Sequence, residues 1–351
     1  MTSAVLVTGG AGFIGTNFVR YIREKRPDTP VVVLDALTYA GVAANVEGLN
    51  GVKLVHGDIR DTGLVEKLLR DHDVETIVHF AAESHVDRSI SGPDAFIDTN
   101  VIGTHSLLKA ARAVFLGGDG RPHRFHHVST DEVYGSLEPE DPAFSESTPY
   151  APNSPYSASK AASDHLVRAY HHTYGLEVTT SNCSNNYGPY QFPEKLIPLF
   201  LLNCLHGREL PIYGDGMNVR DWLYVADHCR GIEAVLDKGT VGDAYNIGGG
   251  EELPNVQVID RLCKVVDRIF ATRPEMAERF PEAPPSRGNS TSSLKTFVED
   301  RAGHDRRYAI DERKARAELG YAPSVDFEEG LALTLDWYIA NDSWWRPLLS
   351  E

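Results

Sequence analysis

Short apolar runs and longer amphipathic stretches alternate along the first half of the chain. The apolar runs predict strands at residues 4–8, 31–34, 52–58, 76–80 and 124–129. Helical spacing of apolar positions predicts helices at residues 13–25, 62–71, 99–113 and 155–174. Strands that alternate with helices are typical of βαβ units, which build a parallel sheet covered by helices on both faces. Because the runs lack polar alternation, we expect an α/β fold whose doubly wound parallel sheet, of the Rossmann type, is buried on both sides.

The pattern becomes irregular after a further strand predicted at residues 178–181. Prolines and turn residues recur there, and a strand-like run at residues 244–247 is expected to rejoin the sheet. A smaller C-terminal lobe should therefore be interleaved with the sheet domain. Residues 273–293 are rich in proline and serine, which predicts an exposed, mobile loop.

The composition and charge of the chain argue against several kinds of binding partner. The chain has 351 residues, of which 42% are hydrophobic, yet no stretch reaches the roughly 18 apolar residues that a membrane span requires. No secretion leader precedes the first strand, so we expect a cytoplasmic protein. A net charge of −16 argues against general binding to nucleic acid. The four cysteines (Cys183, Cys204, Cys229 and Cys263) have no metal-ligand spacing, so we expect no metal site.

A glycine-rich turn lies between the first strand and the first helix. Gly9, Gly12 and Gly15 allow a tight turn in which a pyrophosphate lies on the helix N-terminus. A glycine motif alone is weak evidence, but Asp35 follows the second strand, 20 residues after Gly15. A carboxylate there binds both ribose hydroxyls and repels a 2′-phosphate, which favours NAD over NADP. Asp58 and Ile59, after the third strand, are candidate adenine contacts. We therefore expect residues 1–177, with returning segments near 221–250, to form the NAD-binding domain, and residues 178–351 to form mainly the substrate lobe.

Tyr156 and Lys160 are spaced four residues apart on the helix predicted at 155–174, which places them on one face. Lowering a tyrosine pKa from about 10 toward about 7 requires about 4 kcal/mol of preferential phenolate stabilisation. We expect the ammonium of Lys160 to contribute to it, so that Tyr156 can remove a hydroxyl proton as hydride leaves for the cofactor.

Two adjacent acids, Asp131 and Glu132, follow Thr130 at the end of the strand predicted at residues 124–129. Strand C-termini in such sheets face the ligand crevice. If their surroundings separate their pKa values, one acid can donate a proton while the other accepts one. The alternative is a turn with two solvated acids.

Blocks over nearly the whole chain resemble dTDP-glucose 4,6-dehydratases, a branch of the extended short-chain dehydrogenase/reductases. These blocks are residues 9–15, 37–41, 81–90, 129–135, 156–160, 182–190, 193–198, 220–222 and 303–308. The Thr-Asp-Glu triplet at residues 130–132 is the specific one, since related sugar epimerases usually have two small hydroxyl residues there. Departures are few: Val42 and Ala302 replace the usual Asn and Pro.

The resemblance implies an internal redox cycle on the glucosyl unit. Tyr156 removes the O4 proton while C4 gives hydride to NAD, and Thr130 bonds the same oxygen. Glu132 then removes the C5 proton, and Asp131 protonates the departing C6 hydroxyl. Hydride returns to C6, which yields the 4-keto-6-deoxy sugar nucleotide and regenerates NAD.

The resemblance also implies two sets of binding residues. The NAD site is expected to contain Gly9, Gly12, Phe13, Ile14, Gly15, Asp35, Ala36, Leu37, Thr38, Asp58, Ile59, Phe80, Ala81, Ala82, Glu83, Ser84, Thr99, Tyr156, Lys160 and Asn186. The sugar-nucleotide site is expected to contain Ser84, Thr130, Asn185, Lys195, Leu196, Pro211, Ile212, Tyr213, Arg220, Asn255, Asp300, Arg301, Ala302, Gly303 and His304. Arg220 and Lys195 suit the diphosphate of the substrate.

Alternatives remain open from the sequence alone. An NDP-sugar 4-epimerase or a UDP-glucuronate decarboxylase uses the same scaffold, although neither eliminates water at C6. A non-catalytic NAD-binding regulator is a further alternative, but such proteins tend to lose the tyrosine or the lysine. No rule fixes the base of the nucleotide, so a dehydratase for another NDP-glucose also stays open. The helices near residues 99–115 and 156–173 resemble those that pair in related dimers, so we expect a homodimer.

Overall fold

The computed structural model describes residues 3–117, 120–300 and 304–349. Its central sheet has seven strands within this part of the chain, all parallel. Their spatial order is β3 (Val52–His56), β2 (Val31–Asp35), β1 (Ala4–Thr8), β4 (Val74–His79), β5 (Arg124–Thr130), β6 (Val178–Cys183) and β10 (Ala244–Ile247). The order reverses between β1 and β4, which is where doubly wound sheets open their ligand crevice. The predicted α/β fold with a doubly wound sheet is thus confirmed.

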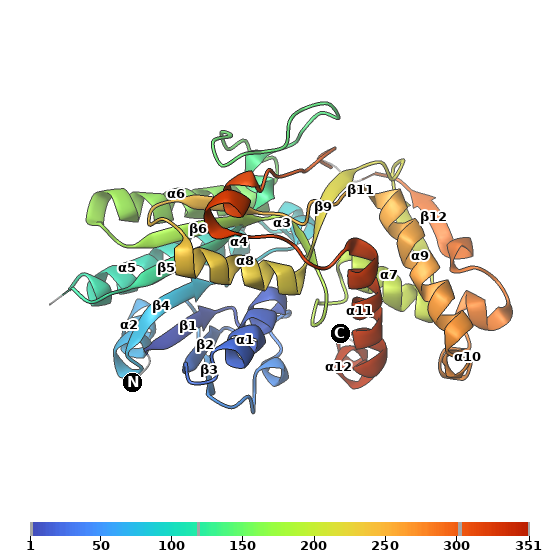
Figure 1. Ribbon diagram of the computed structural model, residues 1–351, viewed down its shortest axis with the longest axis horizontal. Coiled ribbons are helices and arrows are strands. Elements are labelled where there is room, and N and C mark those ends of the chain that lie inside the picture. Colours follow the sequence, from blue (N-terminus) through green and yellow to red (C-terminus); the bar gives the residue numbers. More distant parts are fainter. Residues whose placement is uncertain (1–2, 118–119, 301–303, 350–351) are drawn as a thin grey trace.

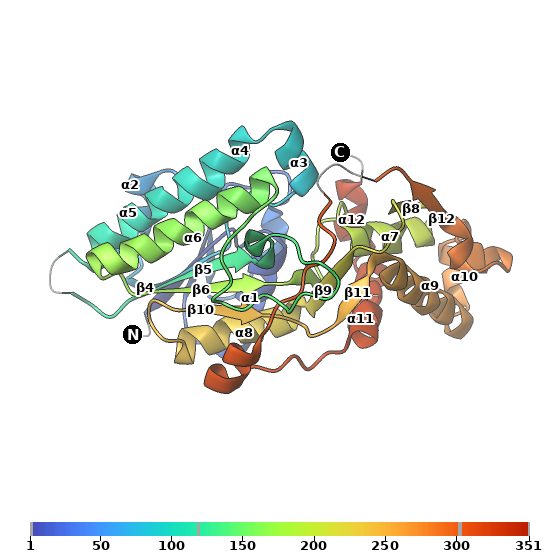
Figure 2. The same ribbon diagram turned by 90° about the horizontal axis from the view of Figure 1, so that it is seen from above.

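Helices cover both faces of the sheet (Figure 2). On one face lie α2 (Thr62–Asp71), α5 (Thr104–Phe115) and α6 (Pro155–Tyr174), and on the other lie α1 (Phe13–Lys25) and α8 (Val225–Lys238). In β2, Val32 and Leu34 pack in the core beneath α2 and α5, while Val31 and Val33 pack in the core beneath α1 and α8. A strand buried on both sides has no polar face, which explains the unbroken apolar runs in the sequence.

A second lobe lies beside the carboxyl ends of the strands (Figure 1). It contains α7 (Leu196–Leu205), β8 (Leu210–Tyr213), α9 (Asn255–Thr272), α10 (Glu275–Arg279), β12 (Lys295–Val298), α11 (Phe327–Ala340) and α12 (Asp342–Leu348). All of these elements except β12 contribute side chains to a separate apolar core. A small sheet of β7 (Asn185–Tyr187), β9 (Val219–Tyr224) and β11 (Glu252–Pro254) lies between the lobe and the central sheet.

The chain crosses between these two parts more than once. β6 and β10 complete the central sheet, although both lie beyond residue 177. Between them the chain builds α7, β8 and β9 and returns through α8, which packs beside α1. The smaller lobe is therefore interleaved with the sheet, because its segments leave and re-enter at the same edge.

Most residues of the proline- and serine-rich segment at 273–293 are exposed, as expected, but the segment is not the irregular loop that its composition predicted. It contains α10 and two short 3₁₀ turns, and Met276, Phe280 and Ala283 are buried in the core of the lobe. Thr291 is also buried and donates a hydrogen bond to Asp267. The prediction of an irregular loop was wrong because single apolar residues, spaced among polar ones, pack into the core of the lobe and hold the segment in place.

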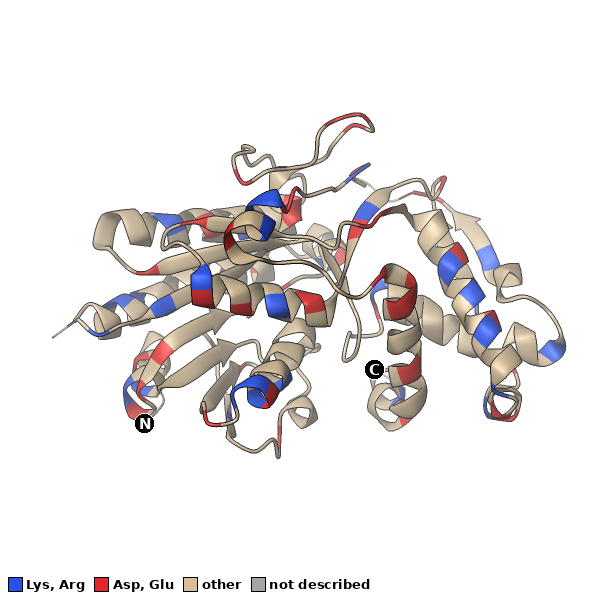
Figure 3. Ribbon diagram, in the orientation of Figure 1, with Lys and Arg blue, Asp and Glu red and all other residues tan. Residues whose placement is uncertain are grey.

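The helix predicted at residues 99–113 is longer and less regular than expected. Short helices α3 (Val86–Ser91) and α4 (Asp94–Phe96) precede it, and a π-helical segment (Ile97–Gly103) leads into α5. No helix in the described ranges is both long and apolar enough to cross a membrane. Basic and acidic residues are interspersed over both parts of the molecule (Figure 3).

Candidate active site

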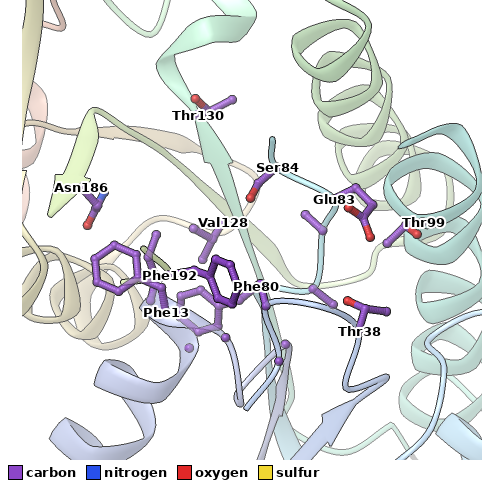
Figure 4. A pocket seen from close by; sticks show the side chains of 18 of the residues that line it. Phe13, Thr38, Phe80, Glu83, Ser84, Thr99, Val128, Thr130, Asn186 and Phe192 are labelled. Carbon is purple, nitrogen blue, oxygen red and sulfur yellow. The ribbon is translucent and has the colours of Figure 1, made fainter. Parts of the chain in front are cut away.

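A cavity of about 450 Å³ opens at the carboxyl ends of the central strands. That volume lies in the range of ligand sites for small molecules. Its walls combine the turns after β1, β2, β4 and β5 with the segment that leads into α7. Figure 4 shows Thr38, Glu83 and Thr99 on one side of the cavity and Asn186 and Phe192 on the other. Both parts of the molecule therefore contribute to one site.

The glycine-rich turn approaches its neighbours too closely for any side chain. Gly9 has φ +69°, and a Cβ there would lie 2.6 Å from the Ala81 nitrogen. A Cβ on Gly15 would lie 2.2 Å from the Gly9 carbonyl oxygen. Helix α1 begins directly after Gly12, lines the cavity with its first residues and has no side-chain cap. An uncapped helix N-terminus behind a glycine turn is suited to a pyrophosphate.

Asp35 ends β2 at the wall of the cavity. Its carboxylate accepts hydrogen bonds from the Ala11 nitrogen at 2.9 Å and the Leu37 nitrogen at 2.8 Å. Burial raises the pKa of this carboxyl group. The two bonds hold the carboxylate between the glycine turn and the loop after β2, the arrangement expected for a ribose contact. The residues present therefore fit a dinucleotide.

Nearly all predicted cofactor residues line this cavity. They are Gly9, Gly12, Phe13, Ile14, Gly15, Asp35, Ala36, Thr38, Asp58, Ile59, Phe80, Ala81, Ala82, Glu83, Ser84, Thr99, Tyr156, Lys160 and Asn186. Leu37 does not line it: this residue has φ 49° and its side chain packs against the apolar core beneath α1.

The acids of the Thr-Asp-Glu triplet lie in a 3₁₀ turn (Asp131–Tyr134) at the end of β5. The Thr130 hydroxyl accepts a hydrogen bond from the Glu132 nitrogen at 3.3 Å and caps this turn. Asp131 is 1% exposed, and burial, followed by the charges of Glu132 and Asp221, raises its pKa well above the ordinary value. The direction of this shift favours the protonated form of Asp131, which is the form that can donate a proton.

Tyr156 and Lys160 lie on the buried face of α6, one turn apart. Ser154 and Ser157 form a capping box that starts this helix, and Pro155 occupies its first position. The ammonium of Lys160 donates to the Val128 carbonyl oxygen at 2.9 Å. All five predicted catalytic residues (Thr130, Asp131, Glu132, Tyr156 and Lys160) thus line the same cavity.

The pKa of Tyr156 differs from the expectation. Burial and the charge of Glu132 raise it well above the ordinary value, and a hydrogen bond with Thr130 acts in the opposite direction. The sequence argument considered only groups that favour the phenolate, namely the neighbouring lysine and the positive ring of NAD, whereas burial of the phenol is the largest effect in the protein alone.

The predicted substrate residues fall into two groups. Ser84, Thr130, Asn185, Lys195 and Leu196 line the cavity. Pro211, Ile212 and Tyr213 on β8, Arg220 on β9, Asn255 at the start of α9, and Asp300 and His304 lie in the second lobe, outside the cavity lining. Arg301, Ala302 and Gly303 lie outside the described residues.

Within the second group, Arg220 interacts electrostatically with the catalytic acid Asp131. Arg220 is buried, its guanidinium lies 4.3 Å from the centre of the Tyr308 ring, and it donates to the Asp305 carbonyl oxygen at 3.0 Å. Its charge lowers the pKa of Asp131, against the larger effect of burial. A cation is therefore present beside the acid end of the cavity.

The sequence argument did not single out three side chains that meet at the cavity, from here on called the clasp: Tyr39, Arg88 and Glu194. The Tyr39 hydroxyl donates to Glu194 Oε1 at 3.0 Å, and Arg88 Nη2 lies 3.3 Å from Glu194 Oε2. The Arg88 guanidinium lies 3.7 Å from the centre of the Tyr39 ring. Each residue belongs to a block that carried the family resemblance, and that was the signal from which they could have been found. Cys183, Gln191, Phe192 and Trp222 also line the cavity.

Comparisons with known proteins agree with this site. A family model described as GDP-mannose 4,6 dehydratase matches residues 6–334. A dTDP-glucose 4,6-dehydratase of Xanthomonas campestris pv. campestris strain B100 is 54% identical over 350 residues, covering 98% of this chain and 95% of the relative. A crystal structure of dTDP-glucose 4,6-dehydratase from Streptomyces venezuelae with NAD bound is 50% identical, with a TM-score of 0.84 and coverage of 98% and 99%. That from Bacillus anthracis, in complex with NAD, is 44% identical, with a TM-score of 0.85 and coverage of 99% and 100%.

The resemblance predicted from the sequence is confirmed by these matches. Among the described residues, no cluster of His, Cys, Asp and Glu side chains could hold a metal ion. The chain belongs to the nucleotide-sugar 4,6-dehydratase family, among the dTDP-glucose 4,6-dehydratases.

Proposed function

We propose that this chain dehydrates dTDP-glucose to dTDP-4-keto-6-deoxyglucose with NAD as a cofactor that is regenerated in each cycle. The observation that carries the proposal is the meeting of Tyr156, Asp131 and Glu132 in one dinucleotide cavity. The names of the relatives, and the NAD in the two solved structures, support the same activity.

NAD, when bound, supplies a hydride acceptor and donor and places a positive ring in the cavity. The glycine turn would hold its pyrophosphate and Asp35 its ribose hydroxyls. Phe80 to Ser84, Thr99 and Asn186 would complete the site from the far walls. The 2′-phosphate of NADP would lie against the carboxylate of Asp35, and the two negative groups would repel each other. NAD is therefore favoured over NADP.

The protein's own groups move the protons. As the C4 hydrogen leaves as hydride, the Tyr156 phenolate takes the O4 proton, with Thr130 bonded to the same oxygen. Lys160 and the positive ring of bound NAD would favour the phenolate against the effect of burial. The resulting C4 ketone acidifies the C5 proton, which Glu132 removes. Asp131 delivers its proton to the C6 hydroxyl, so that water leaves as the C5–C6 double bond forms. Its raised pKa favours the protonated form that this step needs.

An epimerase needs only the first of these transfers. A buried acid with a raised pKa in the same cavity as the tyrosine has no task in epimerisation, and its presence supports dehydration over epimerisation. The base of the nucleotide rests on the names of the relatives rather than on a contact in the cavity. Lys195, Arg220 and the residues at 211–213, 255 and 300–304 are proposed to bind the nucleotide diphosphate and the sugar.

The division into domains is part of the same proposal. Residues 1–177, with returning segments near 221–250, would bind NAD, and residues 178–351 would mainly bind the sugar nucleotide. β6 lies in the central sheet, so the boundary concerns ligand contacts rather than strands.

We also propose a homodimer and a cytoplasmic location. Ile97 and Ile102 are 47% and 50% exposed in the π-helical segment that precedes α5, and Ala158 and Ala169 are exposed on α6. Exposed apolar side chains on two neighbouring helical segments suit helix packing between two copies. The four cysteines are free and buried, which fits a reducing compartment. A monomeric mass in light scattering at micromolar concentration would refute the dimer.

The activity is tested with the purified protein and dTDP-glucose, with UDP-glucose in parallel, by following the alkali-induced absorbance of the keto product. We expect a signal with dTDP-glucose that is lost in Tyr156→Phe and Glu132→Gln. A signal with UDP-glucose alone would correct the base, and an epimerised sugar without keto product would contradict the proposal.

A further inference from the structure

A buried carboxylate that the mechanism does not use lies directly behind the catalytic residues. Asp164 is on α6, one turn after Lys160, and is 5% exposed. Its Oδ1 accepts from His127 Nε2 at 3.0 Å, and its Oδ2 accepts from the Ser129 hydroxyl at 2.8 Å and the Tyr150 hydroxyl at 3.0 Å. Three hydrogen-bond donors therefore meet on one buried carboxylate, as burial of such a group requires.

These partners come from the elements that hold the catalytic groups. His127 and Ser129 belong to β5, and Ser129 directly precedes Thr130 and the two acids. Tyr150 belongs to the segment that leads into α6. One carboxylate therefore joins the end of β5 to the helix that carries Tyr156 and Lys160.

The ammonium of Lys160 requires an anion nearby. Lys160 is 4% exposed, its Nζ donates to a neutral carbonyl oxygen, and burial lowers its pKa. An ammonium in such surroundings loses its proton unless a negative charge compensates. Asp164 is the first compensating group, since i and i+4 share one face of a helix and its charge raises the Lys160 pKa.

Tyr156 and Glu132 share the cavity with Lys160, and the mechanism uses both in the reaction. Four other titratable groups that interact with Lys160 or Asp164 do not provide that charge. His127 on β5 and His79 on β4 have pKa values lowered by burial, so both are neutral at pH 7. Cys183 on β6 is a neutral thiol, because burial raises its pKa to about 12. Burial likewise raises the pKa of Tyr150, whose phenol stays neutral.

We propose that Asp164 is a positioning residue of the active site: its carboxylate ties the end of β5 to α6 and keeps the buried ammonium of Lys160 protonated. The inference rests on the proposed function, because it assumes that turnover needs a charged Lys160. Asp164 would contact neither substrate nor cofactor. It would instead keep the charge on Lys160, which lines the cavity.

A pH profile separates the electrostatic role from a structural one. Asparagine at position 164 has nearly the same shape as aspartate but no charge, so Lys160 would lose its proton at lower pH. Activity that needs the ammonium is lost as pH rises through the Lys160 pKa. The activity of Asp164→Asn relative to the unsubstituted protein should therefore fall by about tenfold between pH 7 and pH 9.

Tyr150→Phe is the matched control, because it removes one hydrogen bond from the same carboxylate and leaves the charge. Its activity relative to the unsubstituted protein should be the same at every pH. Circular dichroism and NAD content establish that each variant is folded and loaded. If Asp164→Asn does not fold, Asp164→Glu, which keeps the charge, should retain the original alkaline limb.

A constant activity ratio for folded Asp164→Asn from pH 7 to pH 9 would overturn the inference. So would an alkaline limb moved to lower pH in Asp164→Glu or in Tyr150→Phe. Failure of the proposed function gives a different result, since the unsubstituted protein would then form no keto product at any pH.

Discussion

The Tyr39 hydroxyl donates a hydrogen bond to Glu194 Oε1 at 3.0 Å, which joins two loops that are 155 positions apart in the chain. Tyr39 follows β2 in the NAD-binding part, and Glu194 precedes α7 in the second lobe. Both line the cavity, and Arg88 contacts both. The clasp therefore links the NAD-binding part to the second lobe at the wall of the dinucleotide site. Such a link should slow the release of NAD. The proposed cycle requires this because the cofactor must stay bound between the first and the second hydride transfer.

Tyr39→Phe should shorten the residence of NAD. The substitution keeps the ring under Arg88 and removes one hydrogen bond to a carboxylate, a loss of about 1 kcal/mol. We expect NAD to dissociate about fivefold faster, measured by trapping released NAD with a second dehydrogenase. Tyr174→Phe, at the exposed end of α6, is the control and should leave the rate unchanged. Equal rates for both variants would mean that the clasp does not retain NAD.

Asp131→Asn and Glu132→Gln should interrupt the cycle at different points. Without the acid of Asp131, loss of the C6 hydroxyl should slow by about a hundredfold, while Glu132 still removes the C5 proton. Substrate recovered from deuterated water should then carry deuterium at C5. Glu132→Gln should show neither dehydration nor C5 exchange. The assigned roles are exchanged if Asp131→Asn is the variant that loses C5 exchange.

Asp221 should make stability fall as pH rises. Burial raises the pKa of this carboxyl group to about 6, although it accepts from the Gly249 and Glu251 nitrogens at 3.0 and 2.9 Å. A raised folded-state pKa contributes stability that is complete below the unfolded pKa and is lost as pH rises through about 6.

Urea unfolding of the unsubstituted protein and of Asp221→Asn measures this contribution. The difference in unfolding free energy between them should decline by about 3 kcal/mol from pH 4 to pH 7. For Glu140→Gln, at an exposed site, the difference should not change with pH. A pH-independent difference for Asp221→Asn would contradict the account.

Met276→Ala should destabilise the second lobe. Met276 is 1% exposed in the core beneath α9, and truncation of such a side chain costs about 2–5 kcal/mol. Urea unfolding followed by tryptophan fluorescence measures the loss, because Trp345 belongs to the same core. Glu275→Ala, one residue earlier and exposed, should have little effect. Similar stability for both variants would mean that this segment is not anchored in the core and would support the loop that composition predicted.

Local signals made much of the sheet domain predictable. The bounds of α6 follow from Ser154 and Pro155 at its start and from Gly175, which adopts the left-handed conformation after its end. The dinucleotide turn was equally clear, since Gly9 and Gly15 occupy places where no side chain fits. The capping box joins Ser154 and Ser157, three positions apart, and Gly15 meets Gly9, six positions earlier, so both signals are local.

Other features depend on residues that are far apart in the chain. α7 is apolar on nearly every side, so it has no amphipathic pattern that could distinguish it from a buried strand. The clasp joins positions 39, 88 and 194, whose meeting depends on the fold. The raised pKa of Tyr156 depends on burial, which spacing to Lys160 does not reveal.

The most direct test of the account uses dTDP-glucose labelled with deuterium at C4. Removal of hydrogen from C4 and its return to C6 of the same sugar predict a 4-keto-6-deoxy product with the label at C6, seen by NMR, without added NAD in stoichiometric amount. Label retained at C4 of an epimerised sugar, or lost to solvent without appearing at C6, would contradict the internal redox cycle.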